Sequence, residues 1–194
     1  MTIYLLRHGA TEYNKTKQFT GTRDLPISED GKAALCKADF EPETVYVSTL
    51  CRTHQTAKVL FPTAKLIQIA DLREKCFGIA EGKYYTEISG DECESGDGDD
   101  GRFEGGESSK EFIARTCKAF AKLVDEAFAD GRESLVIVAH GGTQMSVLST
   151  FAQPRQDYYT WCAKNGGGYI LQADAETWKN EHVITVQSEV AYNK

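Results

Sequence analysis

The sequence predicts an α/β fold whose central sheet is mostly parallel. Short apolar segments in the first part of the chain alternate with segments of helical periodicity. Parallel strands need a crossover connection, so this alternation of strands and helices indicates parallel pairing. Farther along, an aliphatic run at 135–138 follows a long amphipathic segment and is typical of a strand buried on both faces.

The amino-terminal elements follow from local signals. Residues 3–6 are apolar and are expected to form the first strand, and residues 11–17 one or two helical turns. Turn-forming residues at 20–26 predict a loop. Ser28 is the expected N-cap of a helix that continues to about Asp39.

The next segment repeats the pattern of strand, helix and strand. Residues 45–48 and 65–69 are the expected second and third strands. The helix between them covers 50–61 and ends at Pro62, because proline disrupts a helix interior. A loop at 71–74 is expected to follow the third strand.

Residues 90–107 interrupt the alternation, because glycine and acidic residues dominate them. We expect a mobile, solvated loop here. A calcium-binding loop is the alternative, since Asp97 and Asp99 have the spacing of the first two EF-hand ligands. Gly101 and Ser108 stand where that motif needs a third oxygen ligand and the closing glutamate, so the sequence does not favour calcium.

The carboxyl-terminal part contains the longest expected elements. An apolar stripe predicts an amphipathic helix over 109–128, followed by a buried strand at 135–139 and a helix at 143–151. Two later strands, at 168–172 and 182–187, are expected at an edge of the sheet.

Composition narrows the range of partners. The 194 residues are expected to form a single domain, and 41% apolar and 26% charged residues are ordinary for a globular protein. A formal net charge of −7 argues against nucleic acid or an anionic membrane, because both require clustered Lys and Arg. No apolar segment approaches the ~20 residues that span a bilayer, and no secretory signal precedes the first strand. We therefore expect a cytoplasmic protein whose oligomeric state the sequence leaves open.

The six cysteines are scattered along the chain. Zinc and redox motifs need closely spaced ligands, and a chain of this size does not need disulfides for stability. We therefore expect reduced thiols and no metal site.

Residues suited to anion binding follow the first strand. Arg7, His8 and Gly9 stand at its carboxyl end, where α/β sheets bind ligands. Arginine offers a planar fork of donors that matches a phosphate or a carboxylate group. Histidine can act as a nucleophile or proton carrier near neutral pH. The segment predicts an anion site built from a few converging donors.

A second histidine stands in the same context. His140 ends the strand at 135–139, so parallel neighbouring strands would bring His8 and His140 into one crevice. The other two histidines, His54 and His182, are expected to be structural or exposed.

Two further residues complete the candidate site. Arg52 lies in the first turn of a helix, whose amino end favours anions, and with Arg7 it would clamp a phosphoryl group. Glu74 follows the third strand at the same edge and is the candidate proton donor.

Taken in order, these motifs resemble the histidine phosphatase superfamily, which includes cofactor-dependent phosphoglycerate mutases and alpha-ribazole phosphatases. The resemblance runs from residue 3 to about residue 150. It implies a three-layer α/β/α fold with a mostly parallel central sheet, like that of phosphoglycerate mutase. The motifs that carry it are Arg7-His8-Gly9-Ala10-Thr11 with Asn14, Phe19-Thr20-Gly21, Asp24 to Gly31, Ser48 to Ala57, Leu72-Arg73-Glu74, Phe77-Gly78, Glu81-Gly82, Gly105 to Ser108 and His140-Gly141-Gly142.

The resemblance also implies catalytic roles. His8 would be the nucleophile that forms a phosphohistidine intermediate. Arg7, Arg52 and His140 would hold the phosphoryl oxygens. Glu74 would protonate the leaving oxygen and then activate water. Two guanidinium groups suit phosphoryl transfer, which depends on positioning and on stabilising the charge of the equatorial phosphoryl oxygens.

Four further positions are assigned by the same resemblance. Asn14 and the backbone N–H of Gly141 would assist in holding the phosphoryl group, and Thr20 and Gly21 would border the substrate. The superfamily requires no metal ion, and we expect no cofactor for this chain. Ala80 departs from the family pattern, in which tryptophan is frequent, and this puts substrate preference rather than chemistry in question.

The sequence thus predicts a phosphatase of the histidine acid phosphatase type that hydrolyses small phosphomonoesters, with alpha-ribazole phosphate among the candidates. A phosphoglycerate mutase is one alternative, but mutases generally have additional basic residues around the mouth, and 84–107 is short, acidic and glycine-rich. A catalytically silent phospholigand-binding module is another, although it would be expected to lack His8 or Glu74.

No motif identifies the natural substrate. Tyr84, Tyr85 and Trp161 are candidates for an apolar pocket wall, and equally for the core.

Overall fold

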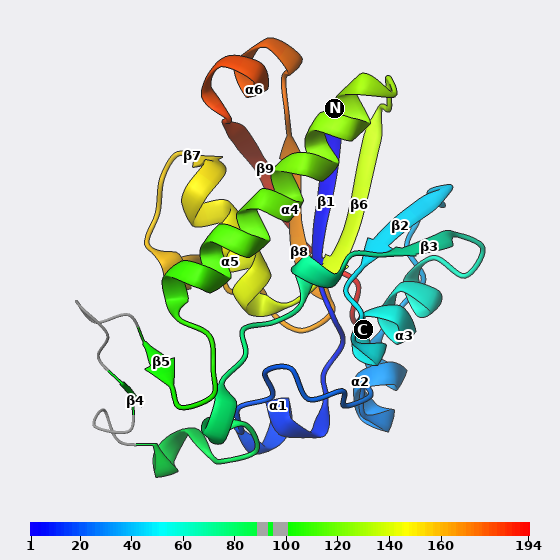
Figure 1. Ribbon diagram of the computed structural model, residues 1–194. Helices are drawn as coiled ribbons and strands as arrows, with labels where there is room; N and C mark the ends of the chain where they lie inside the picture. The colour runs from blue at the N-terminus through cyan, green and yellow to red at the C-terminus, as the bar shows by residue number, and fades with distance from the viewer. Residues whose placement is uncertain (89–92, 95–100) are drawn as a thin grey trace.

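The computed structural model describes residues 1–88, 93–94 and 101–194. Within them, seven strands form one sheet in the order β3-β2-β6-β1-β8-β9-β7 (Figure 1). The strands are β1 (Thr2–Arg7), β2 (Thr44–Val47), β3 (Lys65–Gln68), β6 (Ser134–Ala139), β7 (Ala152–Gln153), β8 (Gly167–Gln172) and β9 (Ile184–Ala191). Two short strands, β4 (Cys93–Glu94) and β5 (Arg102–Phe103), pair separately.

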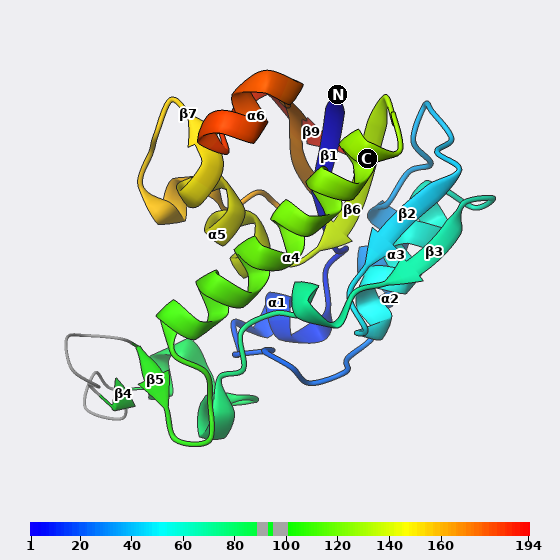
Figure 2. The ribbon, with the colours of Figure 1, turned by 45° about the horizontal axis from the view of Figure 1, so that its top comes forward.

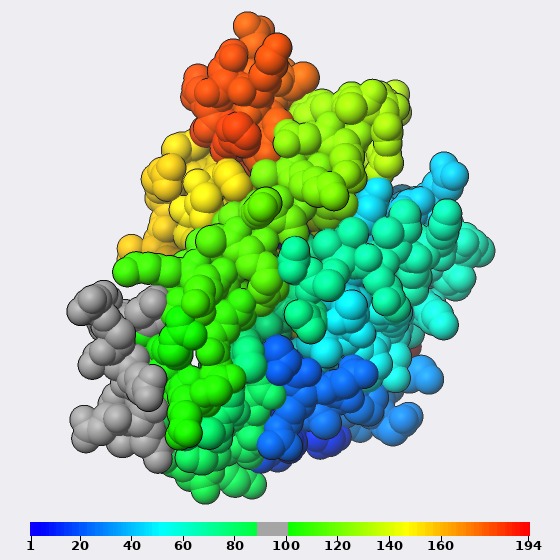
Figure 3. Space-filling model, in the orientation of Figure 1, coloured from blue at the N-terminus to red at the C-terminus, as the bar shows by residue number. Residues whose placement is uncertain are grey.

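Six α-helices connect these strands in the described chain. They are α1 (Glu12–Thr16), α2 (Glu29–Ala34), α3 (Cys51–Leu60), α4 (Ser109–Ala129), α5 (Gly141–Phe151) and α6 (Ala175–Glu181). Helices α4 and α5 lie on one face of the sheet and α3 on the other (Figure 2). In the space-filling view, α4 crosses the near face between α6 and the amino-terminal loops (Figure 3).

The pairing around β1 confirms the mostly parallel sheet. Strand β1 runs parallel to β6, and β2 runs parallel to both β6 and β3. Strand β8 is antiparallel to β1 and to β9. The register sets Arg7 opposite Ala139, so the residues that follow each strand leave the sheet side by side.

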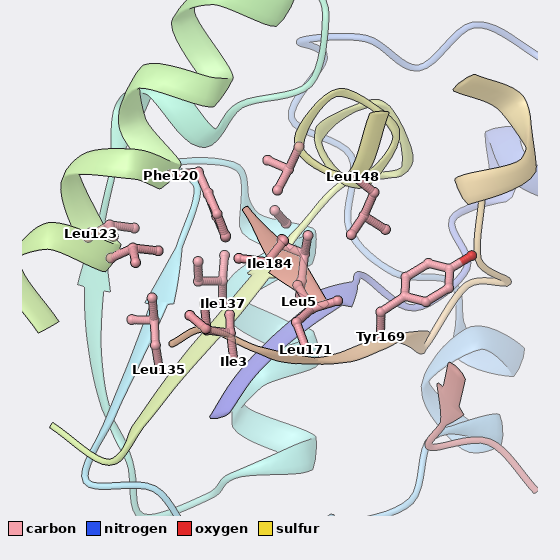
Figure 4. Close-up of a cluster of buried hydrophobic side chains, with 14 of the residues drawn as sticks. Ile3, Leu5, Phe120, Leu123, Leu135, Ile137, Leu148, Tyr169, Leu171 and Ile184 are labelled. Carbon is pink, nitrogen blue, oxygen red and sulfur yellow. The ribbon is translucent and has the colours of Figure 1, made fainter. Parts of the chain in front are cut away.

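Each face of the sheet has its own apolar core. On the α4–α5 face, Phe120 and Leu123 point from α4 toward Ile3, Leu135 and Ile137 (Figure 4). On the α3 face the buried side chains come from both strands and helix, and include Val45, Val47, Val136, Val138, Ala57, Leu60 and Phe61. The central strands β1, β2 and β6 are therefore buried on both faces, as their unbroken apolar runs predict.

Several expected elements differ from those observed. Helix α2 ends at Ala34 instead of Asp39, because Leu35 is extended and pairs with Asn193. Strand β8 lies inside the sheet between β1 and β9, not at an edge. Helix α6 was not expected from the sequence.

The prediction of a mobile, solvated loop over 90–107 falls largely on 89–92 and 95–100, which lie outside the described residues. None of the helices in the described part of the chain is long and apolar enough to cross a bilayer.

We expect Phe120→Ala to lower the free energy of unfolding by about 3–5 kcal/mol, because it leaves a cavity between α4 and the sheet. Phe120 is fully buried and packs against Phe151 and Trp178, with ring centroids 5.7 and 6.1 Å away. Urea unfolding followed by circular dichroism measures the change. Lys118→Ala, at an exposed position of the same helix, should stay within about 0.5 kcal/mol.

Candidate active site

The sheet brings two imidazoles together at its carboxyl edge. The His8 N–H donates to the Ala139 carbonyl over 3.0 Å, which continues the β1–β6 ladder by one residue. The rings of His8 and His140 lie 5.2 Å apart, centroid to centroid, at an angle of 64°. Both side chains are buried, with 4% and 0% exposure. The two histidine rings therefore pack against each other at this edge of the sheet.

The hydrogen bond of His8 fixes its tautomer. Its Nδ1 lies 2.7 Å from the Gly9 carbonyl oxygen, which can only accept, so Nδ1 carries a proton. A neutral ring then has its lone pair on Nε2. Burial lowers the pKa of His8 well below its ordinary value, and the positive charges of Arg52 and Arg7 lower it further.

The His140 ring is held at Nε2, whereas the His8 ring is held at Nδ1. Its Nε2 lies 2.8 Å from the Ser48 hydroxyl oxygen, just beyond the end of β2. Burial, together with Arg52, His8 and Arg7, lowers the pKa of His140 well below its ordinary value. Its Nδ1 is buried and has no hydrogen-bond partner among the described residues.

Arg7 is fixed by the main chain. Its Nη1 donates to the Ala163 carbonyl over 2.7 Å, and it contacts the Cys162 sulfur at 3.4 Å. The guanidinium lies against Gly141, where a Cβ would be 3.2 Å from the Arg7 Cζ. A larger residue than glycine would displace the guanidinium group.

Arg52 is fully buried at the start of α3. Its Nη1 and Nη2 donate to the carbonyls of Arg23 and Gly21 over 2.8 and 2.7 Å. Burial lowers its pKa, but a guanidinium starts so high that the group stays charged near neutral pH. The Nε atoms of Arg7 and Arg52 are buried without a hydrogen-bond partner in the described residues.

Glu74 follows the 3-10 turn Ala70–Leu72 and reaches the start of α5. Its Oε1 accepts from the Lys75 N–H over 2.9 Å and its Oε2 from the Gly142 N–H over 3.1 Å. At Gly142 a Cβ would come within 2.1 Å of the Glu74 Oε1. Gly142 therefore lets the carboxylate approach the helix, a role that the sequence did not reveal.

The loop at Thr20 and Gly21 is anchored by Glu81. Its Oε1 accepts from the Thr22 N–H over 2.7 Å and from the Phe77 N–H over 3.1 Å. Gly21 has φ +52°, and a Cβ there would meet the Glu81 carboxylate. The Thr20 Oγ1 is buried without a partner in the described chain.

Asn14 is engaged in local structure. Its Oδ1 accepts from the Thr11 N–H over 3.0 Å in a capping box of α1 and from the Asn165 Nδ2 over 3.2 Å. The side chain nevertheless borders the cavity described next.

A cavity of about 600 Å³ opens onto these groups. Its lining includes every predicted site residue except His140, which is fully buried and packs its ring against that of His8. The predicted residues in the lining are Arg7, His8, Asn14, Thr20, Gly21, Arg52, Glu74 and Gly141.

The other candidates divide between cavity and core. Tyr85 lines the cavity, Tyr84 does not, and Trp161 is buried in the core at 3% exposure. His54 and His182 are not part of the lining. Among the described residues, no three His, Cys, Asp or Glu side chains are grouped so as to hold a metal ion.

A neutral imidazole, two guanidinium groups and a carboxylate around one cavity define the class as an α/β protein with an anion site suited to phosphoryl groups. Its family follows from comparison with known proteins. The chain belongs to the histidine phosphatase superfamily (branch 1), whose sequence profile matches residues 3–185.

Curated relatives include both phosphatases and mutases. The chain is 29% identical over 158 residues to a broad-specificity phosphatase of Saccharomyces cerevisiae, with 75% of this chain and 68% of that protein covered. It is 36% identical over 98 residues to a 2,3-bisphosphoglycerate-dependent phosphoglycerate mutase of Bifidobacterium longum. That match covers 44% of this chain and 40% of the mutase.

Solved structures support the same fold. A putative alpha-ribazole-5'-P phosphatase from Escherichia coli has a TM-score of 0.76 at 19% identity, with 100% of this chain and 96% of that chain covered. A mycobacterial glucosyl-3-phosphoglycerate phosphatase has a TM-score of 0.73 at 22% identity, with 100% and 99% covered. The predicted phosphoglycerate mutase-like fold is confirmed.

We expect acid to destabilise the protein through His8 and His140. Their pKa values are lowered in the folded state, whereas unfolded histidines protonate near about pH 6.5. The unfolded chain therefore takes up protons that the folded chain does not as the pH falls below about 6.5, and the free energy of unfolding decreases.

Imidazole ¹⁵N NMR in phosphate-free buffer provides the direct measurement. Both rings should keep the spectrum of a neutral imidazole at pH values where the histidines of the unfolded chain are already protonated. A titration midpoint at or above about 6.5 for either ring would contradict the expectation.

Proposed function

We propose that this protein is a phosphatase that hydrolyses small phosphomonoesters through a phosphohistidine intermediate on His8. The observation that carries the proposal is the state of His8: neutral, with its Nδ1 proton held by Gly9. The Nε2 lone pair is thereby available, and the side chain lines a cavity flanked by Arg7 and Arg52.

Unpartnered buried polar atoms support an oxyanion as the ligand. In the described chain, four such atoms belong to predicted site residues: Arg7 Nε, Arg52 Nε, His140 Nδ1 and Thr20 Oγ1. Buried donors without partners are costly, and phosphoryl oxygens would satisfy them.

The proposed chemistry has two displacements. In the first, the His8 Nε2 attacks phosphorus, the bond to the leaving oxygen breaks, and Glu74 supplies that oxygen with its proton. In the second, Glu74 takes a proton from water, the water oxygen attacks phosphorus, and the P–N bond breaks to release phosphate and neutral His8. A covalent intermediate divides one difficult displacement into two easier ones.

The remaining residues hold the transferred group. Arg7, Arg52 and His140 bind the phosphoryl oxygens, assisted by the Asn14 side chain and by the Gly141 N–H at the amino end of α5. Thr20 and Gly21 border the substrate. These steps need no metal ion, and the enzyme is of the histidine acid phosphatase type.

Hydrolysis is favoured over the mutase alternative by the charges of the cavity. Besides Arg7 and Arg52, the cationic side chain in the described lining is Lys75, whose Nζ donates to the Gly101 carbonyl and the Ser109 hydroxyl over 2.7 and 3.0 Å. A mutase grips a substrate carboxylate in addition to the phosphoryl group. A silent binding module is disfavoured because His8 and Glu74 both face the cavity.

We expect His8→Ala to eliminate turnover of p-nitrophenyl phosphate while the variant still binds inorganic phosphate. Wild-type enzyme quenched in alkaline denaturant, which preserves the P–N bond, should carry a phosphoryl group on His8 that mass spectrometry detects. The control is His182→Asn at an exposed position with φ +52°, which asparagine tolerates. Retained turnover in His8→Ala would refute the covalent mechanism.

We also expect Ser48 to position His140. If the Ser48 hydroxyl donates to the His140 Nε2, the ring proton lies on Nδ1 and can be donated to a phosphoryl oxygen. Ser48→Ala should then lower kcat/KM about tenfold and change the tautomer of His140 in ¹⁵N NMR spectra.

Thr53→Val is the matched control for Ser48→Ala. The Thr53 Oγ1 lies 3.2 Å from the Ser48 hydroxyl, and its hydrogen-bond partners in the structure do not include His140. Activity in this variant should stay within about twofold of wild type. An unchanged His140 tautomer in Ser48→Ala would contradict the positioning role.

A further inference from the structure

Beyond the phosphoryl end, the cavity continues between aromatic side chains. One wall consists of Phe19, Phe77 and Tyr85. The Phe19 ring lies 5.0 Å from Phe77 and 4.7 Å from Tyr85, centroid to centroid, and 5.7 Å from the buried ring of Phe103. Edge-to-face contacts of this kind hold the rings in place. The wall is therefore preformed.

A second wall comes from the helical side of the cavity. Helix α4 contributes Phe112 and Ile113, and α5 contributes Met145. The 3-10 turn Tyr158–Trp161 adds Tyr158 and Tyr159, whose rings lie 5.3 Å apart at 88°. Tyr159 is 81% exposed, so its ring lies at the solvent edge of the cavity.

Few charged side chains line the cavity. In the described lining they are Arg7, Arg52, Glu74 and Lys75. Lys75 lies at the aromatic wall, with its Nζ 5.8 Å from the centroid of the Phe77 ring, but it is only 9% exposed and its Nζ donates to the Gly101 carbonyl and the Ser109 hydroxyl. An anionic leaving group would therefore lose hydration between these walls, and the cation of the described lining that lies beside them is already hydrogen-bonded to the protein.

The volume also exceeds what a phosphoryl group requires. At about 600 Å³ the cavity is within the range of sites for whole small molecules, and apolar walls with few polar groups are typical of such sites. Because the walls continue directly from the phosphoryl end, the group that occupies them is the leaving group of the same substrate.

We propose that this enzyme selects phosphomonoesters whose leaving group is uncharged and aromatic over esters whose leaving group carries a carboxylate or a second phosphate. The inference rests on the proposed phosphatase function and specifies its substrate class. The aromatic ring of the leaving alcohol packs between the two walls, while its ester oxygen faces Glu74.

Three primary-alcohol esters test the preference, so that leaving-group reactivity stays comparable. We expect kcat/KM for 2-phenylethyl phosphate to exceed that for glycerol 3-phosphate and for phosphoglycolate by at least about tenfold. Equal values for the three esters in an active enzyme would overturn this inference and leave the phosphatase function intact. No hydrolysis of any ester would overturn the phosphatase function itself.

Two neighbouring tyrosines provide a matched pair of variants. Tyr85 and Tyr84 are 49% and 45% exposed, and only Tyr85 lines the cavity. Tyr85→Ala should raise KM for 2-phenylethyl phosphate, with a loss of about fivefold in kcat/KM. The kcat/KM for glycerol 3-phosphate should change by less than about twofold.

Tyr84→Ala should leave both esters within about twofold of wild type. Equal losses on both esters in Tyr85→Ala would contradict a leaving-group contact.

A gain-of-function variant tests the charge argument: Met145→Lys should raise kcat/KM for phosphoglycolate relative to 2-phenylethyl phosphate by about tenfold. An unchanged ratio in a folded Met145→Lys protein would count against the proposal.

Discussion

The parallel pairing of β1 with β6 is the constraint on which the site depends. Because Arg7 lies opposite Ala139, His8 and His140 leave the sheet at the same level, and the His8 N–H still pairs with the Ala139 carbonyl. A slip of one residue would reverse the faces of every side chain in a strand. The aliphatic residues of both strands are buried on both faces, so packing and register reinforce each other. The geometry of the two imidazoles is therefore a consequence of the core.

Electrostatics then gives these histidines their chemical state. Arg52 is fully buried, and its Nη atoms are bonded to the carbonyls of Gly21 and Arg23 rather than to carboxylates. Main-chain carbonyls satisfy donors without neutralising the charge. Burial contributes most to the lowered pKa of His8 and of His140, and the positive charges of Arg52 and Arg7 lower both pKa values further. The same charges favour an incoming anion, so one arrangement would supply both the free lone pair and the phosphoryl site of the proposed mechanism.

The sequence predicted the parts of this protein that depend on local order along the chain. Apolar runs located the strands, and the polar residues that follow them located the predicted site. The features that the sequence did not predict depend on contacts between residues far apart in the chain, or are too short to show a pattern. Leu35 leaves the helical conformation to pair with Asn193, a contact between residues far apart in the chain. Helix α6 spans seven residues, too few for its periodicity to stand out. The partnership of Ser48 with His140 joins two strand ends, and no spacing along the chain encodes it.

Gly142 links the chemistry of the site to the shape of the cavity. A Cβ at this position would lie 2.1 Å from the Glu74 Oε1 and 3.0 Å from the Phe112 ring. The Glu74 carboxylate and the Phe112 ring therefore both lie beside Gly142 on α5, close to the space that a side chain at this position would fill. In the proposed mechanism, the leaving oxygen that receives a proton from Glu74 would be bonded to a carbon beside Phe112. The groups proposed for the reaction and those proposed for the selectivity would then follow one another along the substrate, with the division at its ester oxygen.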